Sequence, residues 1–284
     1  MTLHNLTAAD GGRLLDDLTT IVSRAAAAVL AARAGGLKGR NKADMSPVTA
    51  ADEAAEAVII DAVSRLLPGL PIVSEEAAGR APPARLDGSF VLVDPVDGTR
   101  ELLAGRDEFT VNLALIDGGR PILGVISAPA RGLLWRAAAG FGAERLRLSP
   151  GAPVDAARER TAIRPRPLPS GALRAAVSRS HFDSQTQAFL TRLSPLEQIA
   201  SGSSVKFCWI AEGTADVYAR LAPTHEWDIA AGHAIVTAAG GTMTTPDGQP
   251  LCYGQTTENF LVPGFMAWGD PAARARLGEA PRPA

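Results

Sequence analysis

One ten-residue segment constrains the fold of this chain more than any other part of the sequence. It reads Phe90-Val-Leu-Val-Asp94-Pro95-Val96-Asp97-Gly98-Thr99, an apolar run that ends at an aspartate. The run predicts a buried strand, and Asp94 then lies at its carboxyl end, where open α/β sheets place their ligands. Pro95 keeps Asp94 out of the helical region, and the turn that follows brings Asp97 back to the same side. The segment therefore predicts an α/β fold with two carboxylates at one edge of a sheet.

These oxygen atoms suit a divalent metal ion. The two carboxylates and the Val96 carbonyl can converge on one point, and ligation by oxygen alone favours Mg²⁺. Gly98-Thr99 then opens a short helix, expected from Arg100 to Ala104, whose free N–H groups can hold a phosphate beside the metal. The competing interpretation is a surface turn, because Asp, Pro and Gly all favour turns. A surface turn does not by itself require the combination of Asp94, Pro95, Asp97, Gly98 and Thr99 after a buried strand.

Composition limits the partners of the chain. Its 284 residues suit one large domain or two closely packed smaller ones. Hydrophobic residues make up 46% and charged residues 20%, which is typical of a globular protein. The formal net charge of −2 supplies no basic field for a nucleic-acid backbone, so binding of a nucleic-acid polymer is not expected. A bound metal can still supply positive charge for an anionic small molecule.

The expected location is the cytoplasm. The two cysteines, Cys208 and Cys252, are too few for a disulfide framework and are expected to be buried thiols in a reducing compartment. The N-terminal region lacks the pattern of a signal peptide, and no segment has the roughly 20 apolar residues of a membrane span. We therefore expect no integral membrane association. Peripheral association and a homodimer stay open.

Periodicity and turn residues predict the elements of the first part of the chain. Two helices with apolar stripes are expected at 14–34 and 49–67, the second capped by Thr49 with Asp52 in a capping box. The expected strands are 70–74, which ends in Glu75-Glu76, then 90–93, the hairpin 110–115 and 121–128 joined at Asp117-Gly118-Gly119, and 133–137.

The second part is expected to form its own lobe. Strands are predicted at 175–178 and 216–219, and helices at 184–193, 205–212 and from Trp227 to Gly240-Gly241. The predicted division is an N-terminal α+β lobe at 1–150 with most metal ligands, a Pro- and Arg-rich linker or loop at 151–171, a C-terminal α/β substrate lobe at 172–270 and a frayed tail at 271–284.

The motifs together resemble the inositol monophosphatase family. Asp94-Pro-Val-Asp-Gly-Thr99 is similar to its first signature, and Trp227-Asp-Ile-Ala-Ala-Gly232 to its second. Glu75-Glu76 resembles the Glu-Glu pair of the family, and Ser46-Pro-Val-Thr-Ala-Ala-Asp52 resembles its N-terminal segment. The resemblance spans roughly residues 38 to 265. It implies a layered α-β-α-β-α sandwich of the inositol monophosphatase/fructose-1,6-bisphosphatase type, with the metal site between two lobes.

The resemblance also implies roles for single residues. Glu75, Asp94 and the Val96 carbonyl would bind a first Mg²⁺, and Asp94, Asp97 and Asp228 a second, with a third, weaker ion near Glu75. The implied catalytic residues are Asp52, Thr99 and Glu75, of which Thr99 and Asp52 orient and deprotonate the attacking water.

Each of these acids has a simpler explanation. Asp52 can serve only as a helix cap, Glu75 can lie at a solvated strand end, and Asp228 can favour the helix dipole. Taken one at a time these explanations are strong, but together they leave the order of the acids around the first signature unexplained.

The second part of the chain resembles the 3′(2′),5′-bisphosphate nucleotidase branch of the family. The similar segments are Ser178-Arg-Ser-His181, Ser201-Gly-Ser-Ser-Val-Lys-Phe-Cys208, Pro223-Thr-His-Glu-Trp-Asp228 and Glu108-Phe-Thr-Val-Asn112. Leu221 stands where inositol-type enzymes carry an acid that binds sugar hydroxyls. The resemblance implies that Gly98, Thr99 and Asp228 contact the substrate. It makes Ser180, His181, Ser203, Lys206 and Arg220 candidates for the rest of the nucleotide.

The expected activity is Mg²⁺-dependent hydrolysis of the 3′-phosphate of adenosine 3′,5′-bisphosphate, and of its sulfated form, to AMP and phosphate, a reaction of sulfur assimilation. The small-molecule partner is thus a phosphorylated nucleotide. Two alternatives stay open. One is an inositol or sugar phosphatase of broad specificity, and the other is a non-catalytic, metal-dependent nucleotide or phosphate sensor. The sensor would be expected to lack a metal ligand or the Thr99–Asp52 pair, and none is missing here.

Overall fold

The computed structural model describes residues 8–41, 47–78, 86, 88–180 and 183–273. Its helices are α1 (Ala8–Ala34), α2 (Ala50–Leu66), α3 (Glu75–Ala78), α4 (Thr99–Leu103), α5 (Ser184–Thr191), α6 (Val205–Ala211) and α7 (Glu226–Ala239), with 3₁₀ turns η2 (Pro129–Arg131), η3 (Val154–Ala156) and η4 (Thr256–Glu258).

A seven-stranded sheet, here called the first sheet, forms the centre of the molecule. Its strands lie in chain order and are β3 (Ile72–Ser74), β4 (Ser89–Asp97), β5 (Thr110–Asp117), β6 (Arg120–Ala128), β7 (Leu133–Ala138), β8 (Gly142–Arg147) and β9 (Glu159–Ala162). Only β3 and β4 pair in parallel, and the other neighbours are antiparallel. Consecutive antiparallel pairing fits the short turns of the sequence, such as Gly118-Gly119 between β5 and β6.

A five-stranded sheet, here called the second sheet, lies beyond it. Its strands, in spatial order, are β11 (Leu196–Ser201), β10 (Leu173–Ser178), β12 (Val217–Arg220), β16 (Phe265–Trp268) and β14 (Thr242–Thr244). The strand β10 pairs in parallel with both neighbours, while β16 is antiparallel to β12 and β14. Two short pairs complete the strands: β1 (Arg40–Asn41) with β2 (Pro47–Val48), and β13 (Thr224–His225) with β15 (Leu261–Val262).

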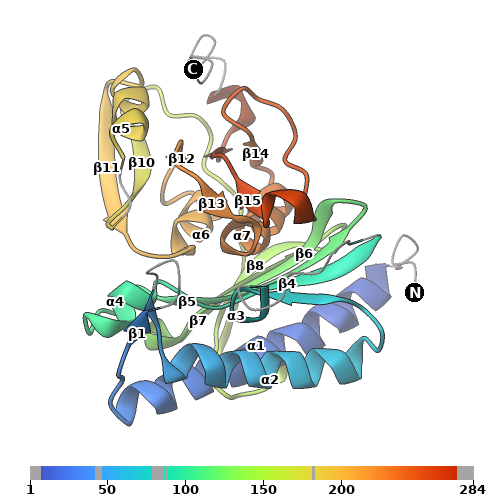
Figure 1. Cartoon of the computed structure of the whole chain (residues 1–284). Helices are drawn as coiled ribbons and strands as arrows, with labels where there is room; N and C mark the ends of the chain where they lie inside the picture. Colours follow the sequence, from blue (N-terminus) through green and yellow to red (C-terminus); the bar gives the residue numbers. More distant parts are fainter. Residues whose placement is uncertain (1–7, 42–46, 79–85, 87, 181–182, 274–284) are drawn as a thin grey trace.

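The layers alternate between helices and sheets, as Figure 1 shows. Helices α1 and α2 cover one face of the first sheet, and their apolar residues share a core with alternate residues of β4, β5 and β6. Helices α6 and α7 lie between the two sheets in a second core, and α5 packs on the outer face of the second sheet in a third. The predicted α-β-α-β-α order is therefore observed. No helix of the described residues is long and apolar enough to cross a membrane.

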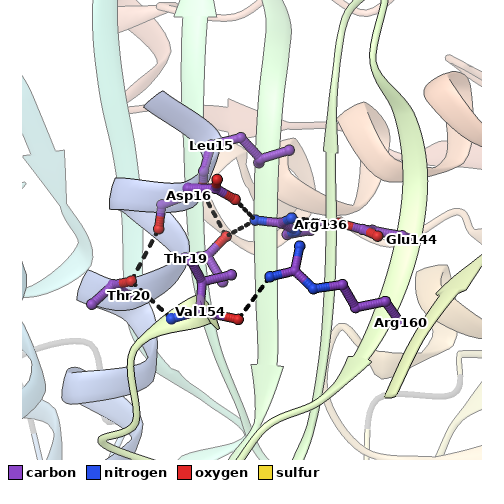
Figure 2. A network of polar contacts seen from close by, with 8 residues as sticks. All are labelled: Leu15, Asp16, Thr19, Thr20, Arg136, Glu144, Val154 and Arg160. Carbon is purple, nitrogen blue, oxygen red and sulfur yellow. Dashed lines mark hydrogen bonds and ion pairs between the residues drawn. The ribbon is translucent and has the colours of Figure 1, made fainter. Parts of the chain in front are cut away.

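A buried arginine fastens α1 to the first sheet (Figure 2). Arg136 of β7 is 1% exposed and donates to Asp16 of α1 at 2.5 Å and to Glu144 of β8 at 2.7 Å. Its guanidinium also lies 3.3 Å from the Thr19 hydroxyl. Burying a charged guanidinium costs free energy unless an opposite charge pairs with it, and the carboxylates of Asp16 and Glu144 are these partners. The network thus fixes the position of α1 on the sheet.

Most of the predicted elements are present with small shifts of their ends. The helix α2 begins after Thr49, whose backbone and side chain form the predicted capping box with Asp52. Two differences from the prediction concern strands, and the first of them lies at the site. The strand β4 continues past Asp94 to Asp97, with a register irregularity that leaves Pro95 and Val96 without a cross-strand partner. The strand β9 falls inside the range predicted as a linker and extends the first sheet to Ala162. The end of the predicted tail, 274–284, lies outside the described residues.

Candidate active site

A cavity of about 240 Å³ opens between the two sheets. Residues from β4, α3 and α4 line it on the side of the first sheet, and residues from α6, β12, β13 and α7 line it on the other side. Ten of the predicted site residues line this cavity: Glu75, Asp94, Val96, Asp97, Gly98, Thr99, Ser203, Lys206, Arg220 and Asp228. Segments far apart in the sequence therefore meet at one place.

The turn after β4 is shaped by a glycine. The backbone N–H of Val96 donates to Asp94 Oδ1 at 3.1 Å, which orients that carboxylate toward the turn. Gly98 has φ of +94°, a left-handed conformation that favours glycine. A Cβ atom at Gly98 would also lie 2.8 Å from the carbonyl oxygen of Glu108. Both the conformation and the close contact require glycine where α4 begins.

The acids of the cavity form a cluster of like charges. Asp94 is 1% exposed, and burial raises its pKa well above the usual range, with further rises from the charges of Glu75, Asp97 and Asp228. Burial also raises the pKa of Asp97 to about 7, followed by the charge of Asp228, while Lys206 opposes the rise. A cation bound beside these buried carboxylates would stabilise their charged form and so oppose the rise of their pKa values.

The donor set fits Mg²⁺ in its chemistry. Every candidate ligand is a carboxylate or carbonyl oxygen, and no histidine or cysteine is needed. As the described side chains stand, no three acidic, histidine or cysteine groups are already drawn together around one point. Glu75, Asp94, Asp97 and Asp228 nevertheless line the same cavity, so changes of side-chain rotamer can bring their oxygens to one ion.

Thr99 and Asp52 form the predicted pair. The Thr99 hydroxyl lies 3.1 Å from Asp52 Oδ1 and 3.0 Å from the Val96 carbonyl, both acceptors. The other oxygen of Asp52 accepts from the Thr49 backbone at 2.8 Å and from its hydroxyl at 2.7 Å. Asp52 is therefore both the helix cap and the partner of Thr99. It does not line the cavity itself and reaches it through Thr99. Burial raises its pKa, and the hydrogen bonds from Thr49 and Thr99 oppose this.

Asp228 enters the cavity from the first turn of α7. Its Oδ2 atom accepts from the Thr224 hydroxyl and, at 3.2 Å, from the His225 backbone N–H. Glu75 enters from the opposite side, as the first residue of α3 directly after β3. The end of β3 and the first turns of α3 and α7 thus place Glu75 and Asp228 at the cavity.

A cationic wall, formed by α6 and β12, lies beside the acids in the same cavity. Lys206 is 2% exposed, its ammonium donates to the carbonyls of Ser203 and, at 3.3 Å, Ser201, and it lies 5.1 Å from the centre of the Tyr218 ring. Burial lowers the pKa of Lys206 to about 8, an effect that the charge of Asp97 opposes. Arg220 donates to the Pro223 carbonyl at 2.9 Å. Two positive groups therefore lie beside the acids in the cavity.

Two donors on this wall are buried without a partner among the described residues, the Ser203 hydroxyl and the Nε atom of Arg220. Ser203 also has φ of +53°, unusual for a residue with a side chain. An unsatisfied buried donor carries a desolvation cost, which a ligand with acceptor oxygens removes.

Two of the predicted nucleotide contacts are not placed on the cavity. The Ser180 hydroxyl donates to Glu101, and Ser180 is not among the lining residues. His181 lies outside the described residues, as does Ser46 of the N-terminal segment. The roles of Ser180 and His181 stay predictions.

Sequence reasoning missed several lining residues, which are Pro47, Arg100, Glu101, Tyr218, Thr224, His225 and Trp227. His225 and Trp227 form a parallel stack with ring centres 4.6 Å apart. Trp227 opens the second signature and His225 lies in the segment that resembles the nucleotidase branch, but neither was assigned a role. Glu101 had a signal that could have been used, since it follows the Gly98-Thr99 turn within the same short helix.

Comparison with known proteins identifies the family and agrees with the fold. The model of the inositol monophosphatase family matches residues 13–266, so the chain belongs to that family. Members of the family are typically Mg²⁺-dependent.

Several relatives that are at least 31% identical to this chain carry one name. The chain is 41% identical to the 3′(2′),5′-bisphosphate nucleotidase CysQ of Escherichia coli K12 over 225 residues, 79% of this chain and 86% of the relative. It is 31% identical to that of Aggregatibacter actinomycetemcomitans over 89% of this chain and 91% of the relative. The crystal structure of CysQ from Bacteroides thetaiotaomicron superposes with a TM-score of 0.73 at 31% identity, covering 91% of this chain and 97% of the other.

Proposed function

We propose that this protein is a 3′(2′),5′-bisphosphate nucleotidase, a metal-dependent phosphomonoesterase that releases the 3′-phosphate of adenosine 3′,5′-bisphosphate, and of its sulfated form, to give AMP. The resemblance to CysQ over most of the chain supports the substrate class. The observation that carries the proposal is the cavity, where Glu75, Asp94, Asp97 and Asp228 meet beside the cationic wall of Lys206, Arg220 and Ser203. The acids suit a metal that receives the scissile phosphate, and the cationic wall suits the second phosphate.

The acids are assigned to the metal. Glu75, Asp94 and the Val96 carbonyl would hold one Mg²⁺, Asp94, Asp97 and Asp228 would hold a second, and a third, weaker ion would bind near Glu75. Mg²⁺ bound there activates water, neutralises the phosphate and stabilises the leaving oxygen.

The residues of the chain position the reactants. The backbone N–H groups of Gly98 and Thr99 hold the scissile phosphate. The Thr99 hydroxyl, held by Asp52 Oδ1, orients the attacking water and directs its proton toward the Asp52 carboxylate. No residue forms a covalent intermediate. Lys206 and Arg220 bind the second phosphate, and the Ser203 hydroxyl donates to it. A small-molecule nucleotide as partner and a cytoplasmic location belong to the same proposal. Both cysteines are free; Cys208 is buried as predicted, whereas the prediction of a buried thiol was wrong for Cys252, which is exposed.

One observation favours a second candidate, a phosphatase of inositol or other sugar phosphates. Leu221 supplies no carboxylate, but Glu101 lines the cavity and is 4% exposed. A buried carboxylate in this position can accept hydrogen bonds from sugar hydroxyls.

The deciding experiment compares phosphate release from adenosine 3′,5′-bisphosphate and from inositol 1-phosphate with Mg²⁺. We expect kcat/KM to favour the nucleotide at least a hundredfold, about 2.7 kcal/mol of transition-state discrimination. Equal rates, or a preference for the inositol ester, would leave the metal assignment standing and overturn the nucleotidase proposal. Absence of turnover on both, with Mg²⁺ still binding, would favour the sensor alternative.

A further inference from the structure

Glu108 joins the ends of two strands of the second sheet to the first sheet. It lies between α4 and β5, and its carboxylate accepts two hydrogen bonds from the Arg179 guanidinium, both at 2.8 Å. The same carboxylate accepts from the Gly202 backbone N–H at 2.7 Å. Arg179 directly follows β10 and Gly202 directly follows β11. One side chain, from the segment just before β5, therefore accepts hydrogen bonds from the residues that follow both strands.

Glu101 makes a second contact of the same kind. It is buried in the short helix α4 and accepts from the Ser180 hydroxyl. Its side chain also lies flat against Gly202, where an added Cβ would lie 2.6 Å from Glu101 Cγ and 2.9 Å from the Glu108 carbonyl oxygen. The close approach at residue 202 therefore depends on glycine.

The segment held in this way carries the cationic wall. Gly202 precedes Ser203, whose left-handed backbone is unfavourable for a residue with a side chain and must be imposed by its surroundings. The Ser203 carbonyl in turn accepts from the Lys206 ammonium. Ser203 also approaches the turn after β4, because a Cβ atom added at Gly98 would lie 3.4 Å from Ser203 Cβ. The turn with Ser203 and the turn with Gly98 thus pack directly on each other.

We propose that Glu108 is a positioning residue that sets the spacing between the metal side and the cationic side of the cavity, acting through Gly202 and Ser203. The proposal rests on the proposed function, because that spacing matters for a substrate with two phosphates. A substrate with one phosphate engages only the metal side and depends far less on Glu108.

The competing explanation is a structural ion pair with no effect on the cavity. The Arg179 side chain is 38% exposed, and an ion pair at such a site contributes little to stability. The Gly202 contact distinguishes the two explanations, because it fixes a backbone amide next to Ser203.

The kinetic test uses two substrates that differ only in the 5′-phosphate, adenosine 3′,5′-bisphosphate and adenosine 3′-monophosphate. We expect Glu108→Ala to lower kcat/KM for the bisphosphate at least tenfold, mainly through KM, and for the monophosphate by less than threefold. Glu108→Gln retains an amide oxygen that can accept from Gly202, so its loss should be intermediate. Equal losses on both substrates would overturn the proposal.

The chain offers a matched control in the preceding residue, Asp107. Asp107 also pairs with an arginine, Arg33 of α1, at 2.7 Å, but that partner belongs to the first part of the chain. Asp107→Asn should change neither specificity constant by more than twofold. An effect equal to that of Glu108→Ala would assign the loss to general electrostatics and overturn the proposal.

A readout without substrate separates this proposal from the nucleotidase assignment. Hydrogen–deuterium exchange of the backbone amides of 201–204 should become at least tenfold faster in Glu108→Ala and stay unchanged in Asp107→Asn. If the wild type does not hydrolyse the bisphosphate, the proposed function fails while this exchange result still supports the positioning role. Unchanged exchange at 201–204 in Glu108→Ala would overturn the positioning role whatever the activity.

Discussion

At the scale of single residues, the cavity concentrates charges that oppose folding. Asp94 is almost fully buried among Glu75, Asp97 and Asp228, and its raised pKa expresses the cost of removing that charge from water and placing it beside others. Function and stability therefore conflict at this residue, as they commonly do where a site is built for a ligand.

Asp94→Asn separates the two effects. The amide has nearly the same shape but no charge, so we expect kcat/KM with Mg²⁺ to fall at least a thousandfold, about 4 kcal/mol. In the presence of EDTA the same variant should be more stable than the wild type by about 1 kcal/mol, because a buried repulsive charge is removed. Phosphate release and urea unfolding measure the two quantities. Asp61→Asn, at an exposed position of α2, is the isosteric control. Activity near that of the wild type would contradict the metal assignment.

His233 of α7 makes stability depend on pH. Burial lowers its pKa to about 4, and its Nδ1 lies 2.8 Å from the Tyr253 hydroxyl. With an unfolded pKa of about 6.5, the unfolded chain takes up a proton below pH 6.5 that the folded protein excludes until about pH 4. The unfolded state thus binds more protons across this window, and stability falls as the pH falls.

We expect His233 to contribute about 1–2 kcal/mol of the stability lost between pH 7 and pH 5, since its side chain is partly exposed. Urea unfolding at the two pH values gives the loss for the wild type and for His233→Gln. Other groups titrate in both proteins, so the difference between the two losses isolates this residue. Identical losses would show that burial of His233 does not disfavour its charged form.

At the scale of elements, the Arg136 network of Figure 2 determines how firmly α1 is attached. Arg136→Met preserves much of the volume but leaves the buried end of Glu144 unpaired, so we expect the free energy of unfolding to fall by about 3 kcal/mol. Arg65→Met removes an exposed pair with Asp61 within α2 and should cost less than about 0.5 kcal/mol. Urea unfolding checks both. A loss for Arg136→Met as small as that for Arg65→Met would mean that the carboxylates are adequately solvated without it.

The elements differ in how far the sequence alone predicts them. The start of α2 was predictable because the capping box of Thr49 and Asp52 is local. The strand β9 was not, since all four of its residues are exposed and it has no apolar signal, and a proline-rich segment surrounds it. The end of β4 was misplaced at Asp94 because Pro95 normally ends a strand, whereas here it sits at the register irregularity, where no ladder hydrogen bond is required.

The residues of the site also differ in how far the sequence alone predicts that they lie together. Asp94, Asp97, Gly98 and Thr99 belong to one contiguous motif, so the sequence predicts that they lie together, and the cavity contains them. Contacts such as Glu101 with Ser180 and Glu108 with Gly202 join residues 79 and 94 positions apart. They depend on how the two sheets pack, which local patterns do not encode.

At the scale of the whole molecule, the acids come from both sides of the space between the sheets. Asp94 and Asp97 belong to β4 of the first sheet, whereas Asp228 lies in the first turn of α7, which packs between the first and second sheets. A cation bound by all three carboxylates would reduce the repulsion between Asp228 and the two acids of β4. It would also reduce the repulsion between Asp94 and Asp97. Metal binding should therefore stabilise the folded protein as a unit, in addition to supporting catalysis.

Mg²⁺ should accordingly raise the thermal unfolding midpoint by several degrees, with the increment growing with the logarithm of free Mg²⁺ above the dissociation constant. At a hundredfold excess over that constant, one site contributes about 2.7 kcal/mol. Scanning calorimetry of the wild type from EDTA to millimolar Mg²⁺, at constant ionic strength, measures the shift. Asp94→Asn should show a much smaller shift because it lacks the carboxylate assigned to both ions, whereas Asp61→Asn should follow the wild type. A midpoint for the wild type that does not move with Mg²⁺, or an equal shift in Asp94→Asn, would mean that these acids do not form the metal site.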